Sequence, residues 1–212
     1  MVKTRPSFNE ERLLWEKGYS LVAGIDEVGR GAFAGPLVTA AVIFPQNCQF
    51  SDPALHEIND SKLLSEKKRK SLSEKIKQTA LSFNITEIPL HYINRFGIGK
   101  AAQLGFYKTV RALSIQPEFC LIDAFWITRM SKKMQKPIIH GDALSYSIAA
   151  ASIIAKVYRD ELMVTLHNYA SVYNFAENKG YGTGFHRSQL AKHGLSPFHR
   201  KSFALGKFLT NN

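Results

Sequence analysis

The sequence has very little cysteine. Cys48 and Cys120 are the only two cysteines among its 212 residues, and each lies in apolar surroundings. Two distant cysteines without a C-x-x-C pair exclude a disulfide scaffold and the common zinc and redox motifs. We therefore expect two buried structural thiols in a reducing compartment.

Long hydrophobic runs are also absent. The longest uncharged segment of the alanine-rich region, residues 143–155, contains three serines and is shorter than the ~20 apolar residues of a membrane span. Residues 1–20 lack the apolar core and small-residue cleavage site of a signal peptide. We expect a cytoplasmic protein that does not bind membranes.

Acidic residues are in the minority. There are 17 Asp and Glu against 28 Lys and Arg, which gives a net charge of +11, while 45% hydrophobic residues suffice for a core. Such an excess favours a polyanionic partner, either nucleic acid or an anionic membrane surface. The second is disfavoured, because no amphipathic helix combines bulky apolar residues with a basic face. After Asn178 the chain contains six Lys or Arg, three His and no acid, and we expect these basic residues to contact phosphates of the partner.

The order of apolar and periodic segments predicts an α/β domain with a mixed sheet. A Gly-rich loop between the first two strands indicates a hairpin. The predicted strands cover residues 21–28, 37–44, 83–88, 118–123 and 137–140, and the predicted helices cover residues 66–81, 98–114 and 143–168.

The first predicted helix is strongly basic. Ser65 is its expected N-cap, and Leu72, Ile76 and Ala80 form one apolar stripe. A basic helix is most often a solvated face, but it can also contact phosphates without sequence specificity. In the last predicted helix, Asp160 is expected to form a salt bridge and not to bind a metal.

Four acids stand at the edges of the predicted core. Asp26 and Glu27 end the first strand, Asp123 ends the strand FCLI, and Asp142 precedes the last helix. Unpaired carboxylates are costly there, and divalent cations such as Mg²⁺ or Mn²⁺ relieve that cost. Paired ions of this kind catalyse in-line displacement at phosphorus.

An alternative interpretation applies to these acids taken singly. Asp142 is also a good helix N-cap. Adjacent strand residues point to opposite faces, so Asp26 and Glu27 share one site only if Glu27 curls back.

Two glycine-containing motifs could contact a nucleic acid. Gly29, Arg30 and Gly31 let the backbone approach a phosphate closely and add guanidinium donors, although a tight turn with a solvated arginine fits equally. Tyr181 lies between two glycines, where its ring or hydroxyl could contact a nucleotide; a packed loop tyrosine is the alternative. None of the seven histidines has metal-ligand spacing.

Six segments together resemble bacterial ribonuclease HII. The resemblance spans roughly residues 20 to 203, and the DEVGRG and AAASIIAKVYRD blocks are the most specific. The segments are GIDEVGRGAFAGPLVTAAVI (24–43), DSKLLS (60–65), LIDAF (121–125), GDALSYSIAAASIIAKVYRD (141–160), NKGYGTGFHRSQLAKHG (178–194) and HRKSF (199–203).

The resemblance implies a ribonuclease H-like fold, a mixed β-sheet flanked by helices with a small helical C-terminal region from about residue 178. Residues 1–19 would be an N-terminal extension, and residues 20–212 the catalytic domain. The implied enzyme is an endonuclease that hydrolyses the RNA strand of RNA–DNA hybrids. It also cuts 5′ of ribonucleotides embedded in duplex DNA and leaves 3′-hydroxyl and 5′-phosphate ends.

The resemblance also assigns roles to residues. Two Mn²⁺ or Mg²⁺ ions would be held by the catalytic carboxylates Asp26, Glu27, Asp123 and Asp142. The Gly29, Arg30 and Gly31 triplet would read the 2′-hydroxyl at the RNA–DNA junction, and Tyr181 would help to sense it. Lys62 and Lys156, in matching segments, are expected to bind substrate. A monomer is expected, and a clamp-type protein partner is not readable from the sequence.

Two alternatives stay open. A non-catalytic nucleic-acid-binding module would explain the positive charge, but it would not need acids at strand ends. A metal-dependent DNA nuclease of the same fold would explain the acids but not the GRG and KGY motifs.

Overall fold

The protein is built around one five-stranded mixed sheet. The computed structural model describes residues 5–46 and 53–209. The strand order is β3-β2-β1-β4-β5; β1 pairs antiparallel with β2, β2 antiparallel with β3, and β4 runs parallel to β1 and β5. The predicted mixed sheet and opening hairpin are confirmed. The strands are β1 (Val22–Val28), β2 (Leu37–Ile43), β3 (Ser82–Ile88), β4 (Phe119–Asp123) and β5 (Gln135–Ile138).

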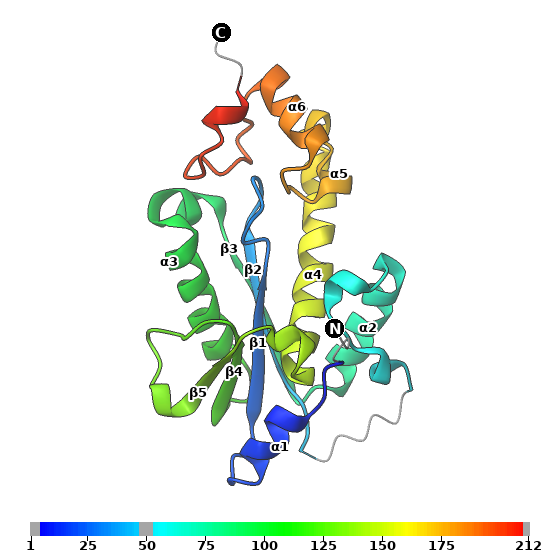
Figure 1. The fold of residues 1–212 in the computed structure, drawn as a ribbon, viewed down its shortest axis with the longest axis vertical. Coiled ribbons are helices and arrows are strands. Elements are labelled where there is room, and N and C mark those ends of the chain that lie inside the picture. Colours follow the sequence, from blue (N-terminus) through cyan, green and yellow to red (C-terminus); the bar gives the residue numbers. More distant parts are fainter. Residues whose placement is uncertain (1–4, 47–52, 210–212) are drawn as a thin grey trace.

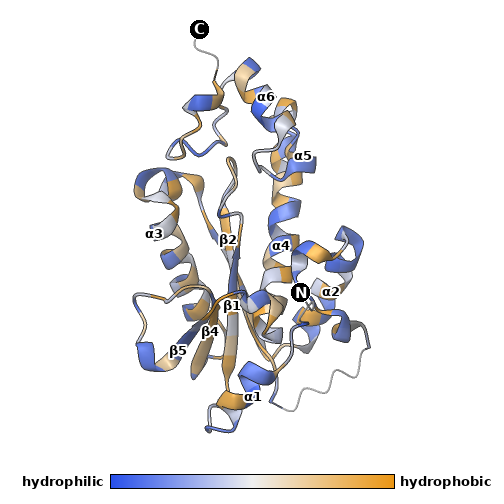
Figure 2. Ribbon diagram, in the orientation of Figure 1, coloured by the Kyte–Doolittle hydropathy of each residue, from blue (hydrophilic) through white to orange (hydrophobic). Residues whose placement is uncertain are grey.

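Helices cover both faces of the sheet (Figure 1). α4 packs on one face, where its alanines and isoleucines join β2 and α2 in a core, and α3 packs on the other face against β1, β2 and β4. β2 is buried and mainly hydrophobic, whereas α2 is mainly hydrophilic (Figure 2). The helices are α1 (Asn9–Trp15), α2 (Glu66–Thr79), α3 (Leu90–Arg111), α4 (Tyr146–His167), α5 (Phe175–Asn178) and α6 (Gly184–His193).

A glycine in β1 brings α4 unusually close to the sheet. A Cβ on Gly24 would lie 2.1 Å from the carbonyl carbon of Ser147 and 2.3 Å from the backbone nitrogen of Ile148. Only glycine therefore permits this contact. The close approach places the turn that precedes α4 beside the carboxyl end of β1.

Helix α2 begins at the predicted residue and ends at Thr79, two residues before the predicted end. The Ser65 hydroxyl accepts a hydrogen bond from the backbone N–H of Lys68, and Leu72 and Ile76 are buried against α4. Asp160 of α4 binds Lys156 and also lies 3.7 Å from Arg69 of α2. The expected salt-bridge role of Asp160 is confirmed.

Helix α3 departs from its prediction. It begins at Leu90 after Pro89 and ends at Arg111, whereas residues 98–114 were expected. Gly97 adopts a left-handed φ of 80° and kinks the helix just before the predicted start at residue 98, and helical turns lie on both sides of this kink.

Two further boundaries are shifted. β5 ends two residues earlier than predicted, because His140 turns the chain with a φ of 57°. α4 begins at Tyr146, after a short 3-10 turn at Gly141–Ala143. The N-cap of α4 is Ser145, whose hydroxyl accepts from the N–H of Ile148. The alternative role of Asp142 as the cap of this helix is therefore wrong.

The N-terminal helix docks on the start of α4. Leu14 is buried and Trp15 partly buried, whereas Leu13 is exposed. The buried Glu11 carboxylate accepts hydrogen bonds from the backbone of Ser147 and from the hydroxyl of Ser145. This helix thus braces the turn that carries Asp142.

The remaining expectations concern cysteine and membranes. Cys120 is a buried free thiol, and burial raises its pKa to about 12; Cys48 lies outside the described residues. Within the described chain, no helix has the length and hydropathy to cross a membrane.

Candidate active site

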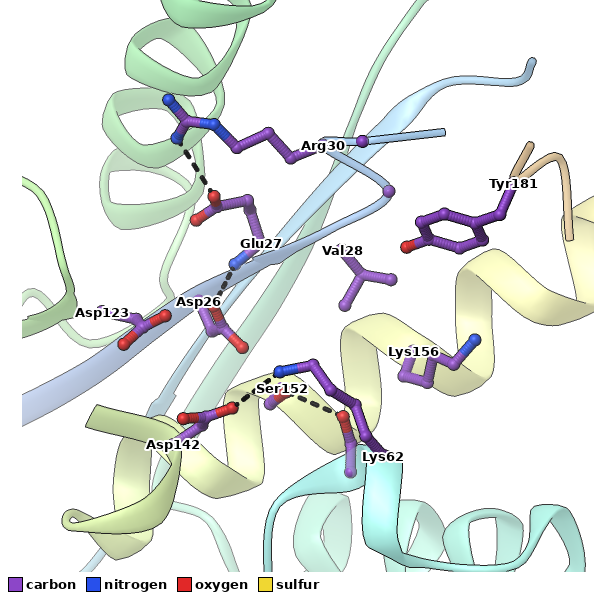
Figure 3. A pocket seen from close by; sticks show the side chains of 13 residues that line it. Asp26, Glu27, Val28, Arg30, Lys62, Asp123, Asp142, Ser152, Lys156 and Tyr181 are labelled. Atoms are coloured by element: carbon purple, nitrogen blue, oxygen red, sulfur yellow. Dashed lines mark hydrogen bonds and ion pairs between the residues drawn. The ribbon is translucent and has the colours of Figure 1, made fainter. Parts of the chain in front are cut away.

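Four carboxylates from three elements line one cavity. β1 and β4 are parallel neighbours, so their carboxyl ends meet and bring Asp26 and Glu27 beside Asp123. The turn before α4 adds Asp142 from below (Figure 3). The cavity has a volume of about 420 Å³ and also contains all the other predicted site residues: Gly29, Arg30, Gly31, Lys62, Lys156 and Tyr181.

Negative charge is crowded at this place. Burial, reinforced by the charges of Glu27 and Asp123, raises the pKa of Asp26 well above its ordinary value. Burial also raises the pKa of Glu27 to about 7, although Arg30 opposes the shift. The pKa of Asp123 is raised mainly by burial, with a contribution from Asp142. Without a cation, the site disfavours full ionisation of these groups.

The two acids of β1 leave the strand in different directions. The strand is regular here, with Asp26 opposite Ala40 and Glu27 opposite Thr39 on β2. The Asp26 carboxylate lies on the side of Asp142, whereas Glu27 is directed toward Arg30 (Figure 3), with 3.2 Å between Glu27 Oε1 and Arg30 Nη1. Glu27 therefore reaches the cavity without curling back over the strand.

A lysine contacts the carboxylate below the strand. Lys62 Nζ is 3.2 Å from Asp142 Oδ2 and 3.8 Å from Asp60 Oδ1. Partial burial lowers the pKa of Lys62, but these carboxylates outweigh burial and raise it overall. Lys156 of α4 also lines the cavity, with its Nζ 2.6 Å from Asp160 Oδ1. An ammonium group thus already compensates part of the negative charge.

The donor set suits a hard divalent cation. Carboxylate oxygens are the ligands that Mg²⁺ and Mn²⁺ prefer, and Glu27 Oε2 is buried without a hydrogen-bond partner. Asp123 is held in place by the N–H of Gly141, 2.8 Å from Oδ1. Among residues 5–46 and 53–209, no three acidic, histidine or cysteine side chains are already arranged around one point as a metal requires. The carboxylates would have to draw closer around an ion.

The loop after β1 is held from behind by two buried arginines. Gly29 has a φ of 91°, and a Cβ there would lie 2.1 Å from Nε of Arg159. Arg200 donates to the carbonyls of Arg30, Gly35 and Pro36 at 2.9–3.1 Å. Gly31 has no heavy atom near the place of a Cβ. Packing explains the glycine at position 29 but not at position 31.

Tyr181 is fixed through its backbone. Its carbonyl lies 2.8 Å from Nδ1 of His186, whose Nε2 lies 3.0 Å from Nε2 of His199. The N–H of Ser196 donates to His199 Nδ1, so the neutral chain requires His199 to donate to His186 and His186 to donate to Tyr181. Both imidazoles are fully buried. The ring of Tyr181 faces the cavity, with its hydroxyl on the carboxylate side (Figure 3).

Sequence reasoning missed several residues of this site. Ser61 and Ser152 line the cavity, and their hydroxyls are 3.0 Å apart. Ser152 also hydrogen-bonds the Asp26 carboxylate. Arg159 and Arg200 are part of the basic excess of the sequence, yet both side chains are fully buried. The expectation that the C-terminal basic residues contact phosphates is therefore wrong for Arg200, which binds carbonyls.

Known proteins resemble this chain in sequence and in fold. A relative from Desulfitobacterium hafniense named Ribonuclease HII is 48% identical over 195 residues, which cover 92% of this chain and 73% of the relative. The ribonuclease H2 structure from Pyrococcus horikoshii OT3 superposes with a TM-score of 0.69 at 22% identity, over 88% of this chain and 95% of that one.

Two further solved structures share the fold. The ribonuclease HII in a PCNA complex from Archaeoglobus fulgidus gives a TM-score of 0.68 at 24% identity, covering 85% of this chain and 92% of that chain. Bst-RNase HIII, solved in complex with Mn²⁺, gives a TM-score of 0.67 at 23% identity, over 89% of this chain and 68% of that chain. They confirm the ribonuclease H-like fold. Residues 23–206 match the family described as Ribonuclease HII, and the chain belongs to that family.

Proposed function

We propose that this endoribonuclease of RNA–DNA hybrids cleaves the RNA strand at the carboxylate cavity, and that it also cuts 5′ of single ribonucleotides in duplex DNA. The products would carry 3′-hydroxyl and 5′-phosphate ends. One observation carries the proposal: four carboxylates, the GRG triplet and Tyr181 line the same cavity, although they come from distant parts of the sequence.

Asp26, Glu27, Asp123 and Asp142 would hold two divalent cations. When bound, such ions stabilise the charge that develops on a phosphate and on the attacking and leaving oxygens. The chain itself keeps these carboxylates buried and in place, through the Gly141 N–H on Asp123 and the Ser152 hydroxyl on Asp26. Lys62, now beside Asp142, would move to a phosphate oxygen of the substrate, and Lys156 would contact the strand from α4.

Recognition of the ribonucleotide would rest on the loop after β1. The open space at Gly31 lets a sugar approach the backbone closely. Arg30 is held by Glu27 and by the buried Arg200 at its carbonyl, so its position is fixed before substrate binds. A 2′-hydroxyl is the group that distinguishes RNA from DNA. Tyr181, whose ring faces the same cavity, would help to sense the junction.

The proposal also covers the extent of the catalytic unit, the location of the enzyme and its partners. Residues 20–212 would be the catalytic unit, and residues 1–19 an extension that braces α4. We place the enzyme in the cytoplasm as a monomer. A clamp-type partner is proposed because the Archaeoglobus fulgidus ribonuclease HII was solved with PCNA.

The test of the site is the variant Asp123→Asn. We expect it to lose cleavage of an RNA–DNA hybrid in Mn²⁺ or Mg²⁺ while its affinity for the hybrid stays within about threefold, because phosphate contacts dominate affinity. Binding is measured by fluorescence anisotropy and cleavage on a denaturing gel. Full activity of this variant at saturating Mn²⁺ would refute the metal assignment. Cleavage by the wild type that survives EDTA would refute metal dependence itself.

A further inference from the structure

Two aromatic rings are exposed beside the cavity. Phe125 and Trp126 lie two and three residues after Asp123 and are 37% and 41% exposed. They belong to the connection between β4 and β5, residues 124–134, which none of the roles above uses. Exposed large aromatics next to each other indicate a surface with a binding partner.

This connection is firmly built. Gln103 of α3 donates to the carbonyl of Trp126 at 2.7 Å and accepts from the N–H of Thr128 at 2.8 Å. The buried amide of Gln135 binds both the N–H and the carbonyl of Ile127, at 2.7 and 3.0 Å. Ile127 is itself buried in the core. The rings are thus presented to solvent by a braced loop, and their exposure is not a sign of loose packing.

The surroundings of the two rings are positively charged. The guanidinium carbon of Arg30 lies 4.1 Å from the centre of the Phe125 ring, and Lys132 Nζ lies 5.7 Å from that of Trp126. A cavity of about 320 Å³ on the α3 side of the same loop is lined by Lys100 and Arg129 and by no acidic residue. This combination of cations and aromatic faces suits a nucleic acid strand.

We propose that residues Phe125 and Trp126 form a nucleotide-binding platform for the substrate strand next to the scissile phosphate. Trp126 contacts a sugar or base of a flanking nucleotide, and Lys100 and Arg129 hold backbone phosphates farther along the strand. Phe125 is a positioning residue, since its ring supports the guanidinium of Arg30. This inference rests on the proposed function and extends the substrate site beyond the GRG triplet.

Tryptophan fluorescence gives a direct test, because Trp15 and Trp126 are the only tryptophans. The protein is titrated with an RNA–DNA hybrid in Ca²⁺, and a gel verifies that the hybrid stays intact. We expect the wild-type emission to change on binding and this change to disappear in Trp126→Phe, which keeps only the Trp15 signal. An equal change in Trp126→Phe, or none in the wild type, would overturn the proposal.

Binding and turnover separate this role from catalysis. Stacking of a base on an aromatic ring contributes to the affinity for a strand. Trp126→Ser should therefore weaken binding of the hybrid and raise KM about five- to tenfold, while kcat stays within twofold of the wild type. Trp126→Phe should retain near wild-type affinity. The matched control is Leu13→Ser. Leu13 is an apolar residue of α1 that is 52% exposed, and it lines a different cavity together with Phe119. Phe119 begins β4, whereas Asp123 ends it.

The cleavage and binding results together separate a failure of the aromatic platform from a failure of the proposed function. If the wild type cleaves the hybrid but Trp126→Ser binds it with unchanged affinity, the platform is refuted and the proposed function stands; a protein partner then becomes the better explanation for the exposed rings. If the wild type does not cleave the hybrid, the proposed function itself fails.

Discussion

Arg200→Lys tests how the C-terminal region supports the active site. The planar guanidinium of Arg200 binds the carbonyls of Arg30, Gly35 and Pro36 at once, and the side chain is fully buried. A lysine ammonium on a single flexible stem cannot reproduce this fork. We expect at least two of the three buried carbonyls to lose a partner.

The magnitude follows from the cost of unsatisfied buried groups. Each carbonyl left without a partner costs about 1–3 kcal/mol; because the Pro36 carbonyl keeps its hydrogen bond from Arg159 Nε at 3.0 Å, one or two unsatisfied carbonyls destabilise the fold by about 1–6 kcal/mol. For a protein of this size, about 3 kcal/mol corresponds to a decrease in Tm of roughly 6–12 °C. Since one of the three carbonyls belongs to Arg30, KM for the hybrid should rise as well. Urea and thermal unfolding at pH 7.5 and steady-state cleavage measure these effects.

A second arginine in the same region provides the control. Arg187 is exposed, and its Nε donates to the carbonyl of Gly182 at 2.8 Å. Arg187→Lys should change stability by less than about 0.5 kcal/mol, because water can replace the lost bond. If Arg200→Lys were as mild as this control, the buried fork would not hold the loop, and the reasoning would be wrong.

Three further changes have defined outcomes. Gly24→Ala, which forces a Cβ into the backbone of α4, should destabilise the protein by about 3 kcal/mol or more in urea, whereas Gly99→Ala, in open space, should be neutral or stabilising. Burial, together with His186, lowers the pKa of His199 to about 4. The free energy of unfolding in urea should therefore be highest above about pH 6.5 and decrease as the pH falls toward 4, and this decrease should be shallower in His199→Gln. The same pH dependence of the free energy of unfolding in both proteins would contradict this. Tyr181→Phe should reduce the preference for a single ribonucleotide over a longer RNA tract in competition cleavage assays, and an unchanged preference would show that the ring alone suffices.

The sequence predicts the convergence of the carboxylates better than their detailed geometry. Asp26 and Asp123 each end a predicted strand, and the resemblance to ribonuclease HII assigns both to one site; the parallel pairing of β1 with β4 is what brings them together. The direction of the Glu27 side chain could not be predicted from the sequence, because it depends on the ion pair with Arg30. The role of Asp142 was ambiguous until Ser145 proved to be the helix cap.

Charge patterns are informative about partners but not about individual residues. Arg159 and Arg200 belong to the basic excess, yet they bind carbonyls inside the protein. No local pattern reveals this, because all of these carbonyls except that of Lys179 come from residues more than a hundred positions away. The kink at Gly97 is similar: the sequence predicts a helix only from residue 98, and only tertiary packing decides that α3 continues on both sides of the kink.

The most direct test of the central claim is the mapping of cleavage on a DNA duplex that contains one ribonucleotide, beside the same duplex without it. With Mn²⁺ or Mg²⁺, we predict a single cut on the 5′ side of the ribonucleotide, with 3′-hydroxyl and 5′-phosphate ends, and no cut in the all-DNA duplex. Cleavage of both duplexes would contradict recognition of the 2′-hydroxyl, and cleavage of neither would contradict the proposed activity at embedded ribonucleotides.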